Sequence, residues 1–403
     1  MSETTKRSSS AGSPKEVFLA FLKLGLTSFG GPIAHLGYFR TEFVERRGWL
    51  SDNQFGQLLA ICQFLPGPAS SQLGFCIGLL RSGWAGALAS FLAFTLPSAL
   101  LLIAFAASLP MLSGHVGAAA IHGLKLVACA VVADAVLGMS RKLCPDATRQ
   151  AIAILALAAL LIVSSAAVQL LVVVSAGMAG ALFLRDVAVF DNSGDIQISY
   201  GPRVGGFLIL LFGALLIGLP IVASGEPELV SVAEVFYRAG ALVFGGGHVV
   251  LPLLQDSVVA TGWVTSDQFL AGYGAAQAIP GPMFAFSAFL GSVLSQGENA
   301  WLMAATALGF MFLPGFLLVA GVLPFWRTVS HSPAAGRAIA GVNAAVVGLL
   351  GAALYNPIFT TGINSSSDLA ITVVAFGLLA VWRLSPLAVV IWCVSASLLR
   401  LWF

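Results

Sequence analysis

Two halves of this 403-residue chain carry the same motifs in the same order. The offset between the copies changes by only one residue from the first motif to the last, so the chain contains a duplicated unit. Its fold must therefore be built from two copies of one arrangement. The duplicated motifs are residues 21–31 and 236–246, the Gly-Trp pairs at 48–49 and 262–263, and Pro-Gly-Pro at 66–68 and 280–282.

Composition makes the chain an all-α, polytopic membrane protein. It is 58% hydrophobic and 9% charged, and its long uncharged runs exceed what a water-soluble fold can bury. In such a protein, helix-breaking motifs at matching positions of two halves indicate a transport site. The net charge of +2, without a Lys/Arg cluster outside the apolar segments, argues against a nucleic-acid partner. Residues 1–15 are polar and lack a cleavage site, which predicts a cytoplasmic N-terminal tail.

Motifs of enzymes and ATP-driven pumps are missing from the sequence. It has no P-loop, Rossmann fingerprint, HExxH or GxSxG, so we expect no cofactor and no enzymatic activity. A membrane-embedded enzyme would need clustered carboxylates or histidines, and only the stretch with Glu42 and Glu45 offers any. The cysteines form no CxxC pair and suit small buried side chains better than a disulfide or metal site. They are Cys62, Cys76, Cys129, Cys144 and Cys393.

Apolar runs of about 20 residues predict six membrane-spanning helices in each half. The predicted domains are a first repeat at 16–184, a linker at 185–233 and a second repeat at 234–403. One further span in the linker starts the second repeat on the opposite side of the bilayer, so the repeats should be inverted. The thirteen predicted spans lie near 16–38, 55–80, 82–110, 116–139, two within 150–184, 204–223, 232–254, 268–296, 299–326, 334–355 and two within 369–403.

The basic residues favour a cytoplasmic N-terminus. With this orientation, twelve of the 19 Lys and Arg side chains lie at cytoplasmic ends of spans, in agreement with the positive-inside rule. The segment 40–47 is the exception, because Arg40, Arg46 and Arg47 fall on the outer side. We predict an amphipathic stretch at the membrane surface there, and it is the weakest part of the predicted topology.

Three basic residues, Lys23, Lys125 and Arg238, lie inside apolar spans, where a charge is costly and usually functional. Lys23 and Arg238 occupy the same repeat position, because five residues lie between each of them and the Phe-Gly-Gly motif of its own repeat. A two-fold axis between the repeats would therefore bring both cations towards one centre. Snorkelling of Lys23 to the interface is the alternative. Asp134 is a carboxylate well inside a span. It is out of phase with Lys125 on a helix, so we expect it to pair elsewhere or to carry a proton.

Both Pro-Gly-Pro motifs fall inside apolar spans, where proline breaks a helix. Gly30-Gly31-Pro32 and Gly245-Gly246-Gly247 should break the first span of each repeat in the same way. A break leaves N–H groups of the next half-helix unpaired near the midplane, which predicts an anion site. Uncharged donors nearby suit the several acceptor oxygens of an oxyanion, although helix packing uses the same residue types. The predicted binding set, besides Lys23, Arg238 and Lys125, is Gly30, Gly31, Gln63, Gly67, Ser70, Ser71, Gly245, Gly246, Gln277 and Gly281, with Asp134, His35 and His248 as candidate proton carriers.

These motifs resemble those of the chromate ion transporter (CHR) family in its long, two-domain form. The likeness rests on Phe-Gly-Gly at 29–31 and 244–246, on the two Gly-Trp pairs, and on Gln63 and Gln277 ahead of Pro-Gly-Pro, and it extends over the chain after residue 15. The resemblance implies a multi-pass protein of the bacterial inner membrane that exports chromate, draws on the proton motive force, recognises sulfate as a similar dianion and confers chromate resistance. The residues alone predict an oxyanion carrier without specifying chromium.

Export has a physical argument of its own. A dianion that leaves an inside-negative cell gains about 4.6 kcal/mol per 100 mV, so the membrane potential can drive its export. Uptake would need co-transported cations. The sequence leaves open a sulfate or oxyanion uptake carrier, a passive anion channel, and assembly as a homodimer.

Overall fold

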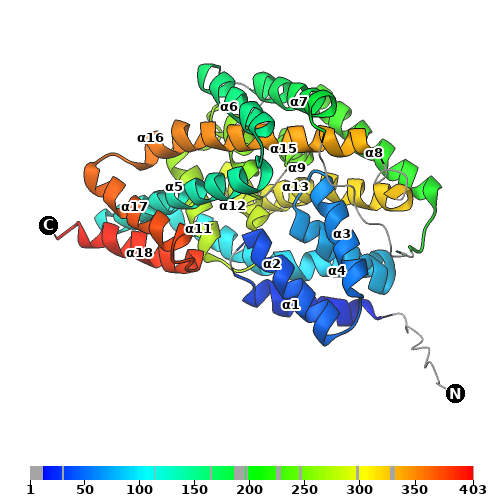
Figure 1. Ribbon diagram of the computed structural model, residues 1–403. Coiled ribbons are helices and arrows are strands. Elements are labelled where there is room, and N and C mark those ends of the chain that lie inside the picture. Colours follow the sequence, from blue (N-terminus) through cyan, green and yellow to red (C-terminus); the bar gives the residue numbers. More distant parts are fainter. Residues whose placement is uncertain are drawn as a thin grey trace.

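The computed structural model describes residues 12–29, 31–112, 114–163, 166–185, 196, 198–223, 228–244, 247–295, 299–326 and 332–402. Every regular element in these ranges is a helix, as the sequence predicts (Figure 1). The first repeat contains α1 (Pro14–Thr27), α2 (Gly31–Arg40), η1 (Thr41–Arg46), α3 (Asp52–Phe64), α4 (Ala69–Ser108), α5 (His115–Leu143), α6 (Ala147–Ile162) and α7 (Ala166–Phe183). The single helix α8 (Pro202–Val222) follows.

The second repeat has the same order of elements. It contains α9 (Leu229–Leu242), η3 (Gly247–Val249), α10 (Val250–Val258), α11 (Ser266–Ala278), η4 (Met283–Ala285), α12 (Phe286–Leu294), α13 (Ala300–Val322), α15 (Pro333–Ala353), η6 (Leu354–Phe359), α17 (Ser366–Ala380) and α18 (Pro386–Leu399). Local signals repeat as well. Helices α3 and α11 both begin with a capping box, formed by Ser51 with Gln54 and by Thr265 with Gln268.

The first predicted span is a helical hairpin. Helix α1 runs inward, and α2 with η1 returns beside it, so that the Phe21 ring stacks on Phe43 with centroids 4.7 Å apart. The Arg81 guanidinium lies 5.0 Å from the Trp49 ring and 3.2 Å from the Glu16 carboxylate at the start of α1. Residues 47–49 therefore return to the side on which α1 begins. The break expected near Gly31 is present, but the chain turns back there instead of crossing, so the single crossing predicted at 16–38 is wrong. The outer position predicted for Arg40–Arg47 is wrong for the same reason.

The second predicted span, at 55–80, is also a hairpin. Helix α3 starts on the same side as α1 and ends at Phe64, and α4 starts at Ala69 after the predicted break at Pro-Gly-Pro. The 13 residues of α3 measure about 20 Å, too short for a bilayer core of about 30 Å. The first part of α4 leads back to Arg81, and after a kink at Ser82 and Gly83 its second part runs across the molecule.

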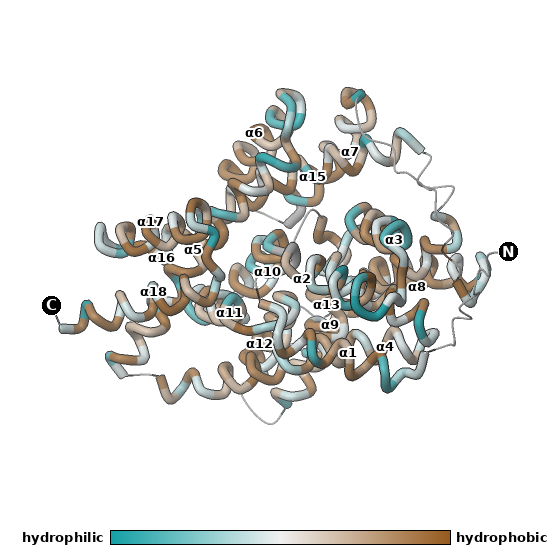
Figure 2. Tube along the Cα trace, turned by 60° about the horizontal axis from the view of Figure 1, so that its bottom comes forward, coloured by the Kyte–Doolittle hydropathy of each residue, from teal (hydrophilic) through white to brown (hydrophobic). Residues whose placement is uncertain are grey.

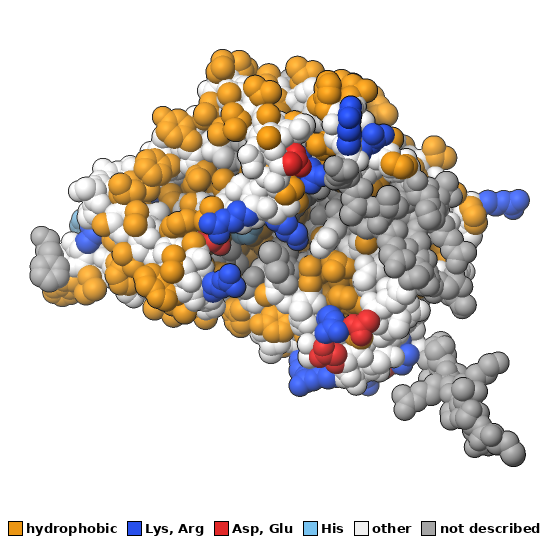
Figure 3. Space-filling model, viewed as in Figure 1, with side chains coloured by type: hydrophobic (Ala, Val, Ile, Leu, Met, Phe, Trp, Pro, Cys, Tyr) orange, Lys and Arg blue, Asp and Glu red, His pale blue; other side chains and the backbone are white. Residues whose placement is uncertain are grey.

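Full crossings are consequently fewer than the thirteen that hydropathy predicts. Among the described residues, five helices are long and apolar enough to cross a membrane. Hydrophobic residues run along the helices in Figure 2, and hydrophobic side chains cover much of the face shown in Figure 3. Large apolar side chains exposed on α8 include Phe207 and Ile217. Lipid chains require such a surface. The five helices are Ala69–Leu112, His115–Leu143, Pro202–Val222, Ala300–Phe325 and Pro333–Gly362.

The two repeats run in opposite directions, as predicted. Trp84, at the start of the second part of α4, lies 5.2 Å from the ring of Tyr200, whose hydroxyl donates to the Ala320 carbonyl near the end of α13. Further along α4, the Phe91 ring lies 5.0 Å from Phe312, which is earlier in α13. The second part of α4 and its counterpart α13 are therefore antiparallel, which is the arrangement of an inverted repeat.

The repeats also exchange their last helices. Helices α6 and α7 of the first repeat pack on α15 of the second, and α17 and α18 pack on α5 of the first (Figure 1). Glycines permit the close approach on both sides. A Cβ at Gly180 on α7 would lie 2.4 Å from the Arg337 carbonyl of α15, and one at Gly123 on α5 would lie 2.7 Å from the Cα of Val394. Each repeat thus completes the core of the other.

Candidate transport site

The hairpin tips of the two repeats meet and are joined by two equivalent hydrogen bonds. The Gly67 N–H, in the first Pro-Gly-Pro loop, donates to the Val243 carbonyl at the end of α9 over 2.7 Å. The Gly281 N–H, in the second loop, donates to the Ser28 carbonyl at the end of α1 over 2.9 Å. These tips, with the two loops, form the central junction. Both loop glycines have positive φ, +124° and +100°, which favours glycine.

Each loop packs tightly against a proline-containing helix of the other repeat. A Cβ at Gly67 would lie 3.0 Å from the Cα of Gly315 on α13, and one at Gly281 would lie 2.8 Å from the Ser98 hydroxyl on α4. The Gln72 amide completes the first contact, because its Nε2 donates to the carbonyls of Pro66 and Gly315 over 2.9 and 3.0 Å. The amides of Gly67 and Gly281 therefore connect the two repeats. The anion site predicted at the N–H groups of the following half-helices stays a prediction.

Other residues predicted for this site lie around the junction in different environments. Ser70 and Ser71 are buried in the first turn of α4, and within the described structure the Ser71 hydroxyl has no hydrogen-bond partner. Gln277 Nε2 contacts Met283 Sδ at 3.3 Å, whereas Gln63 is exposed. Gly31 begins α2 with a φ of +74°. Three predicted residues lie outside the described residues: Gly30, Gly245 and Gly246.

The two histidines make different contacts. His35 is fully buried, packs edge-on against Phe94, and has its Nε2 3.3 Å from the Ser28 carbonyl that also accepts from Gly281. It is therefore part of the central junction. His248 Nδ1 lies 2.6 Å from the Tyr273 hydroxyl in the second repeat.

The two equivalent cations, Lys23 and Arg238, each face a carboxylate of their own repeat. Lys23 Nζ lies 3.5 Å from Glu42 Oε2, and its side chain is half-exposed. Arg238 Nε lies 3.0 Å from Glu234 Oε1, one helical turn earlier. Arg238 lines a cleft to which Lys23 does not contribute. The structure thus does not gather the two cations around a shared space.

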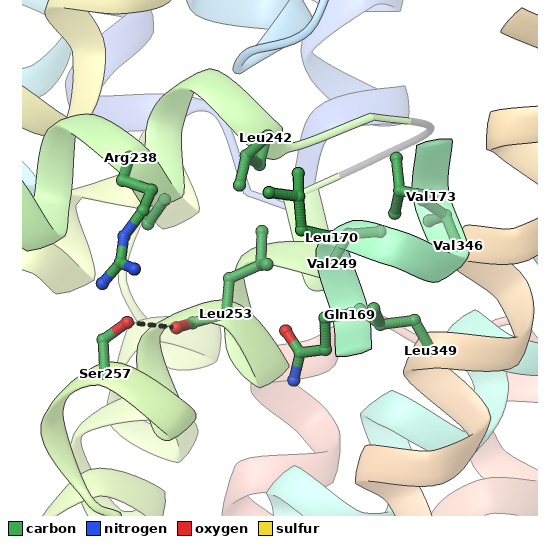
Figure 4. Close-up of a pocket in the computed structure, with 11 residues that line it drawn as sticks. Gln169, Leu170, Val173, Arg238, Leu242, Val249, Leu253, Ser257, Val346 and Leu349 are labelled. Atoms are coloured by element: carbon green, nitrogen blue, oxygen red, sulfur yellow. Dashed lines mark hydrogen bonds between the residues drawn. The ribbon is translucent and has the colours of Figure 1, made fainter. Parts of the chain in front are cut away.

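The cleft of Arg238 opens between α7, α9, α10 and α15 (Figure 4). Most of its wall is apolar, and the guanidinium lies at one end near Ser257, whose hydroxyl donates to the Leu253 carbonyl. Gln169 points into the cleft from α7. A guanidinium in an apolar cleft suits an oxyanion, and the Gln169 amide has two N–H groups with which to add to it. The lining residues are Gln169, Leu170, Val173, Arg238, Ala239, Leu242, Val249, Leu253, Ser257, Val346 and Leu349.

A second cavity adjoins this cleft and shares Gln169 with it. Asp256 lines the second cavity together with the polar residues Gln255, Tyr355 and Asn356. Gln169 Nε2 donates to Asp256 Oδ2 and is thus the polar connection between the two spaces. We call the cleft of Arg238 and this cavity together the Arg238–Asp256 cleft.

Lys125 and Asp134 on α5 have separate surroundings, as their helical phase predicts. Lys125 is buried, and its Nζ lies 2.5 Å from Asp267 Oδ1 in the first turn of α11. Asp134 is half-buried, and within the described structure it has neither a cation nor a hydrogen-bond donor as partner. Neither residue lines the Arg238–Asp256 cleft.

Sequence reasoning missed Glu42 and Asp256 as a pair. Glu42 is buried and accepts from Arg46 and Arg47 in addition to Lys23. Both carboxylates stand six residues before a duplicated Gly-Trp, so the repeat itself marked them as equivalent.

Inverted repeats with broken helices that meet in the interior define a membrane transporter. The chain belongs to the chromate transporter family, whose model matches residues 15–181 and 230–398. This match includes both repeats and supports the resemblance drawn from the motifs.

Relatives with assigned names agree with the family. The chain is 29% identical over 390 residues to a "Probable chromate transport protein" of Synechococcus elongatus, with 94% of each chain covered. It is 28% identical over 342 residues to a "Chromate transport protein" of Pseudomonas aeruginosa, with 84% of this chain and 79% of the relative covered. A "Chromate transport protein" of Cupriavidus metallidurans is 26% identical, with 83% and 80% covered. No solved structure matches the chain.

Proposed function

We propose that this protein is a secondary transporter that exports chromate across the inner membrane of a bacterium and also accepts sulfate. The observation that carries the proposal is the half-exposed Arg238 in an apolar cleft beside the central junction of an inverted-repeat transporter. Family membership supplies chromate as the substrate, because the geometry favours tetrahedral oxyanions in general.

Arg238 is the proposed anchor of the anion. Glu234 occupies its Nε, which leaves the two terminal nitrogens to donate to two oxygens of one dianion. Gln169 and Ser257 supply neutral groups on the same cleft. The apolar wall excludes water and strengthens these interactions. We infer that the anion occupies this cleft because it contains a guanidinium, whereas the amides of Gly67 and Gly281 bond across the central junction.

The membrane potential is the proposed driving force, alone or within the proton motive force. Export of a dianion gains about 4.6 kcal/mol per 100 mV. The orientation rests on basic residues: the hairpin α1–α2 moves Arg40, Arg46 and Arg47 to the side of Arg81 and Lys15. This change removes the conflict with the positive-inside rule and supports a cytoplasmic N-terminus. Export in this direction would confer chromate resistance.

The test measures uptake of labelled chromate and sulfate into inside-out vesicles, with membrane potential and pH gradient clamped separately. Export in the cell corresponds to accumulation in these vesicles, driven by an inside-positive potential. Arg238→Gln should abolish accumulation, and Arg238→Lys should retain part of it because the charge remains while the two-pronged donor geometry is lost. The proposal fails if well-inserted wild-type protein accumulates neither anion under either gradient. Accumulation that never exceeds the electrochemical equilibrium set by the membrane potential, whatever the pH gradient, would indicate the channel alternative.

A further inference from the structure

The Arg238–Asp256 cleft contains a charged pair that has a counterpart in the first repeat. Lys23 and Arg238 share one repeat position, and Glu42 and Asp256 share another. In the first repeat the two members are in contact, with Lys23 Nζ 3.5 Å from Glu42 Oε2. In the second repeat, as far as the structure describes it, the two members form no ion pair, and they line the two adjoining spaces of the Arg238–Asp256 cleft. One fold thus shows the same pair in a closed and an open arrangement.

Neighbouring residues explain why only the second pair is open. Glu42 receives two further cations, Arg46 and Arg47, whose counterparts in the second repeat are the uncharged Ala260 and Thr261. Asp256 therefore lacks those additional partners. In the described part of the chain, its hydrogen-bond partner is the neutral amide of Gln169.

Arg238 is the cation available to Asp256. The titratable and charged side chains that line the cleft are Arg238, Asp256 and Tyr355, and Glu234 contacts Arg238 from its own helix. An ionised carboxylate in apolar surroundings needs a cation partner, and so does an oxyanion that enters the same cleft. The two anions compete for the terminal nitrogens of one guanidinium.

We propose that the Asp256 carboxylate and the transported oxyanion compete for Arg238, so that protonation of Asp256 opens the pair and promotes binding of the anion. The inference rests on the proposed function and adds a proton-linked residue to the same cleft. When Asp256 is protonated, it remains bonded to Gln169, as in this structure, and Arg238 is free for the anion. When Asp256 is ionised and no anion is present, it pairs with Arg238, as Glu42 pairs with Lys23. By reciprocity, binding of the dianion takes up a proton, and export of both together still moves one net negative charge down the membrane potential.

Sulfate is the probe for the test, because it stays a dianion over the neutral range in which chromate itself takes up a proton. Its affinity for the detergent-solubilised full chain is measured between about pH 5 and pH 8. In the pH range where Asp256 is ionised, the affinity of the wild type for sulfate should fall by up to about tenfold for each unit by which the pH rises. This is the slope expected for one linked proton. Asp256→Asn should bind sulfate as tightly as wild type does at low pH and should show no such slope. Asp256→Glu should retain the slope.

Glu45→Gln is the matched control, since Glu45 is a half-exposed carboxylate of the first repeat that pairs with Arg40. It should keep the wild-type slope. A slope that persists unchanged in Asp256→Asn overturns the proposal, even if sulfate binding itself is normal. In weakly buffered solution, calorimetry should register about one proton taken up per sulfate by wild type and none by Asp256→Asn.

A second measurement does not depend on anion binding. Ser257→Cys places a thiol in the cleft, and the rate at which an alkylating reagent modifies it is measured as a function of pH. This rate is divided by the alkylation rate of the exposed thiol of Thr41→Cys at the same pH, because the ratio removes the effect of thiol ionisation. The normalised rate should fall severalfold as pH rises and the pair closes, and Asp256→Asn should remove this fall. If wild type binds no oxyanion but shows this closure, the proposed substrate is wrong and the ion pair stands. An equal pH dependence with and without Asp256 rejects the pair.

Discussion

Substitution of Gly67 by alanine tests how firmly the two repeats are joined at the central junction. Its φ of +124° lies in a region that other residues avoid, at a cost of about 1–3 kcal/mol. The new Cβ would lie 3.0 Å from the Gly315 Cα, which is backbone and cannot turn away, and 2.8 Å from Gln72 Nε2. Displacing Gln72 loses two hydrogen bonds worth about 1 kcal/mol each. We expect a total loss of about 3–5 kcal/mol in the free energy of unfolding.

Gly48→Ala is the matched control. Gly48 also has positive φ, +59°, but a Cβ there meets no atom within 4 Å, so the cost should be only about 1–2 kcal/mol. Gly281→Ala should fall between the two, because its Cβ would mainly displace the Ser98 hydroxyl, which can rotate. Ser98 follows Pro97 as Gly315 follows Pro314, so Ser98→Gly gives the first repeat the residue that the second repeat has. The double variant Gly281→Ala with Ser98→Gly should therefore recover part of the loss.

The assay is thermal unfolding of the purified proteins in detergent, followed by tryptophan fluorescence. At about 2–4 °C per kcal/mol, Gly67→Ala should lower the midpoint by about 6–20 °C, and Gly48→Ala by about 2–8 °C. The argument would be refuted by a midpoint for Gly67→Ala equal to or above that of Gly48→Ala. The Pro-Gly-Pro loop would then contribute no close contact between the repeats.

Three further predictions follow from the fold. Thr41→Cys and Thr261→Cys place thiols at exposed positions, and the five native cysteines are buried. The two new thiols should react with an impermeant thiol reagent from opposite sides of the membrane. Labelling of both from one side would contradict the inversion. Gln72→Leu should lower the free energy of unfolding by about 1–3 kcal/mol, measured by the same thermal assay, because one buried and one part-buried carbonyl lose their donor. Asp267→Ala should reduce the yield of folded protein more than Lys125→Met, since it leaves the buried Lys125 charge unpaired; gel filtration of the detergent extract measures this, and equal yields would argue against the pair.

The sequence was sufficient to predict the helical class, the duplication, its inversion and the breaks at Pro-Gly-Pro. These features depend on local chemistry, because proline and glycine interrupt a helix wherever they stand. The hairpins at 16–38 and 55–80 could not be read from hydropathy, since a hairpin buried among other helices is as apolar as a crossing helix. The misplaced basic residues Arg40, Arg46 and Arg47 were the available sign. A return of the chain to its starting side removes that conflict.

The candidate site was predicted only in part. Arg238 was singled out by its charge in an apolar span, and the structure places it in a cleft. Its neighbour Gln169 comes from α7, which belongs to the other repeat and reaches the cleft by the exchange of helices. A contact between residues so far apart in the sequence cannot be predicted from the spacing of motifs. Asp256 was within reach of sequence reasoning, because it matches Glu42 six residues before Gly-Trp.

The exchanged helices impose an order on biosynthesis. Helix α5 ends at Leu143, but the partners α17 and α18 that cover it start at Ser366, more than 200 residues later. At about 5–20 residues per second, a ribosome needs about 11–45 s to reach them. During that interval the first half must wait in the membrane with lipid, an insertase or a chaperone against the surface of α5. The protein therefore reaches its native core only when its last two helices arrive, and loss of the C-terminal segment should expose the first half as well as the second to proteolytic quality control.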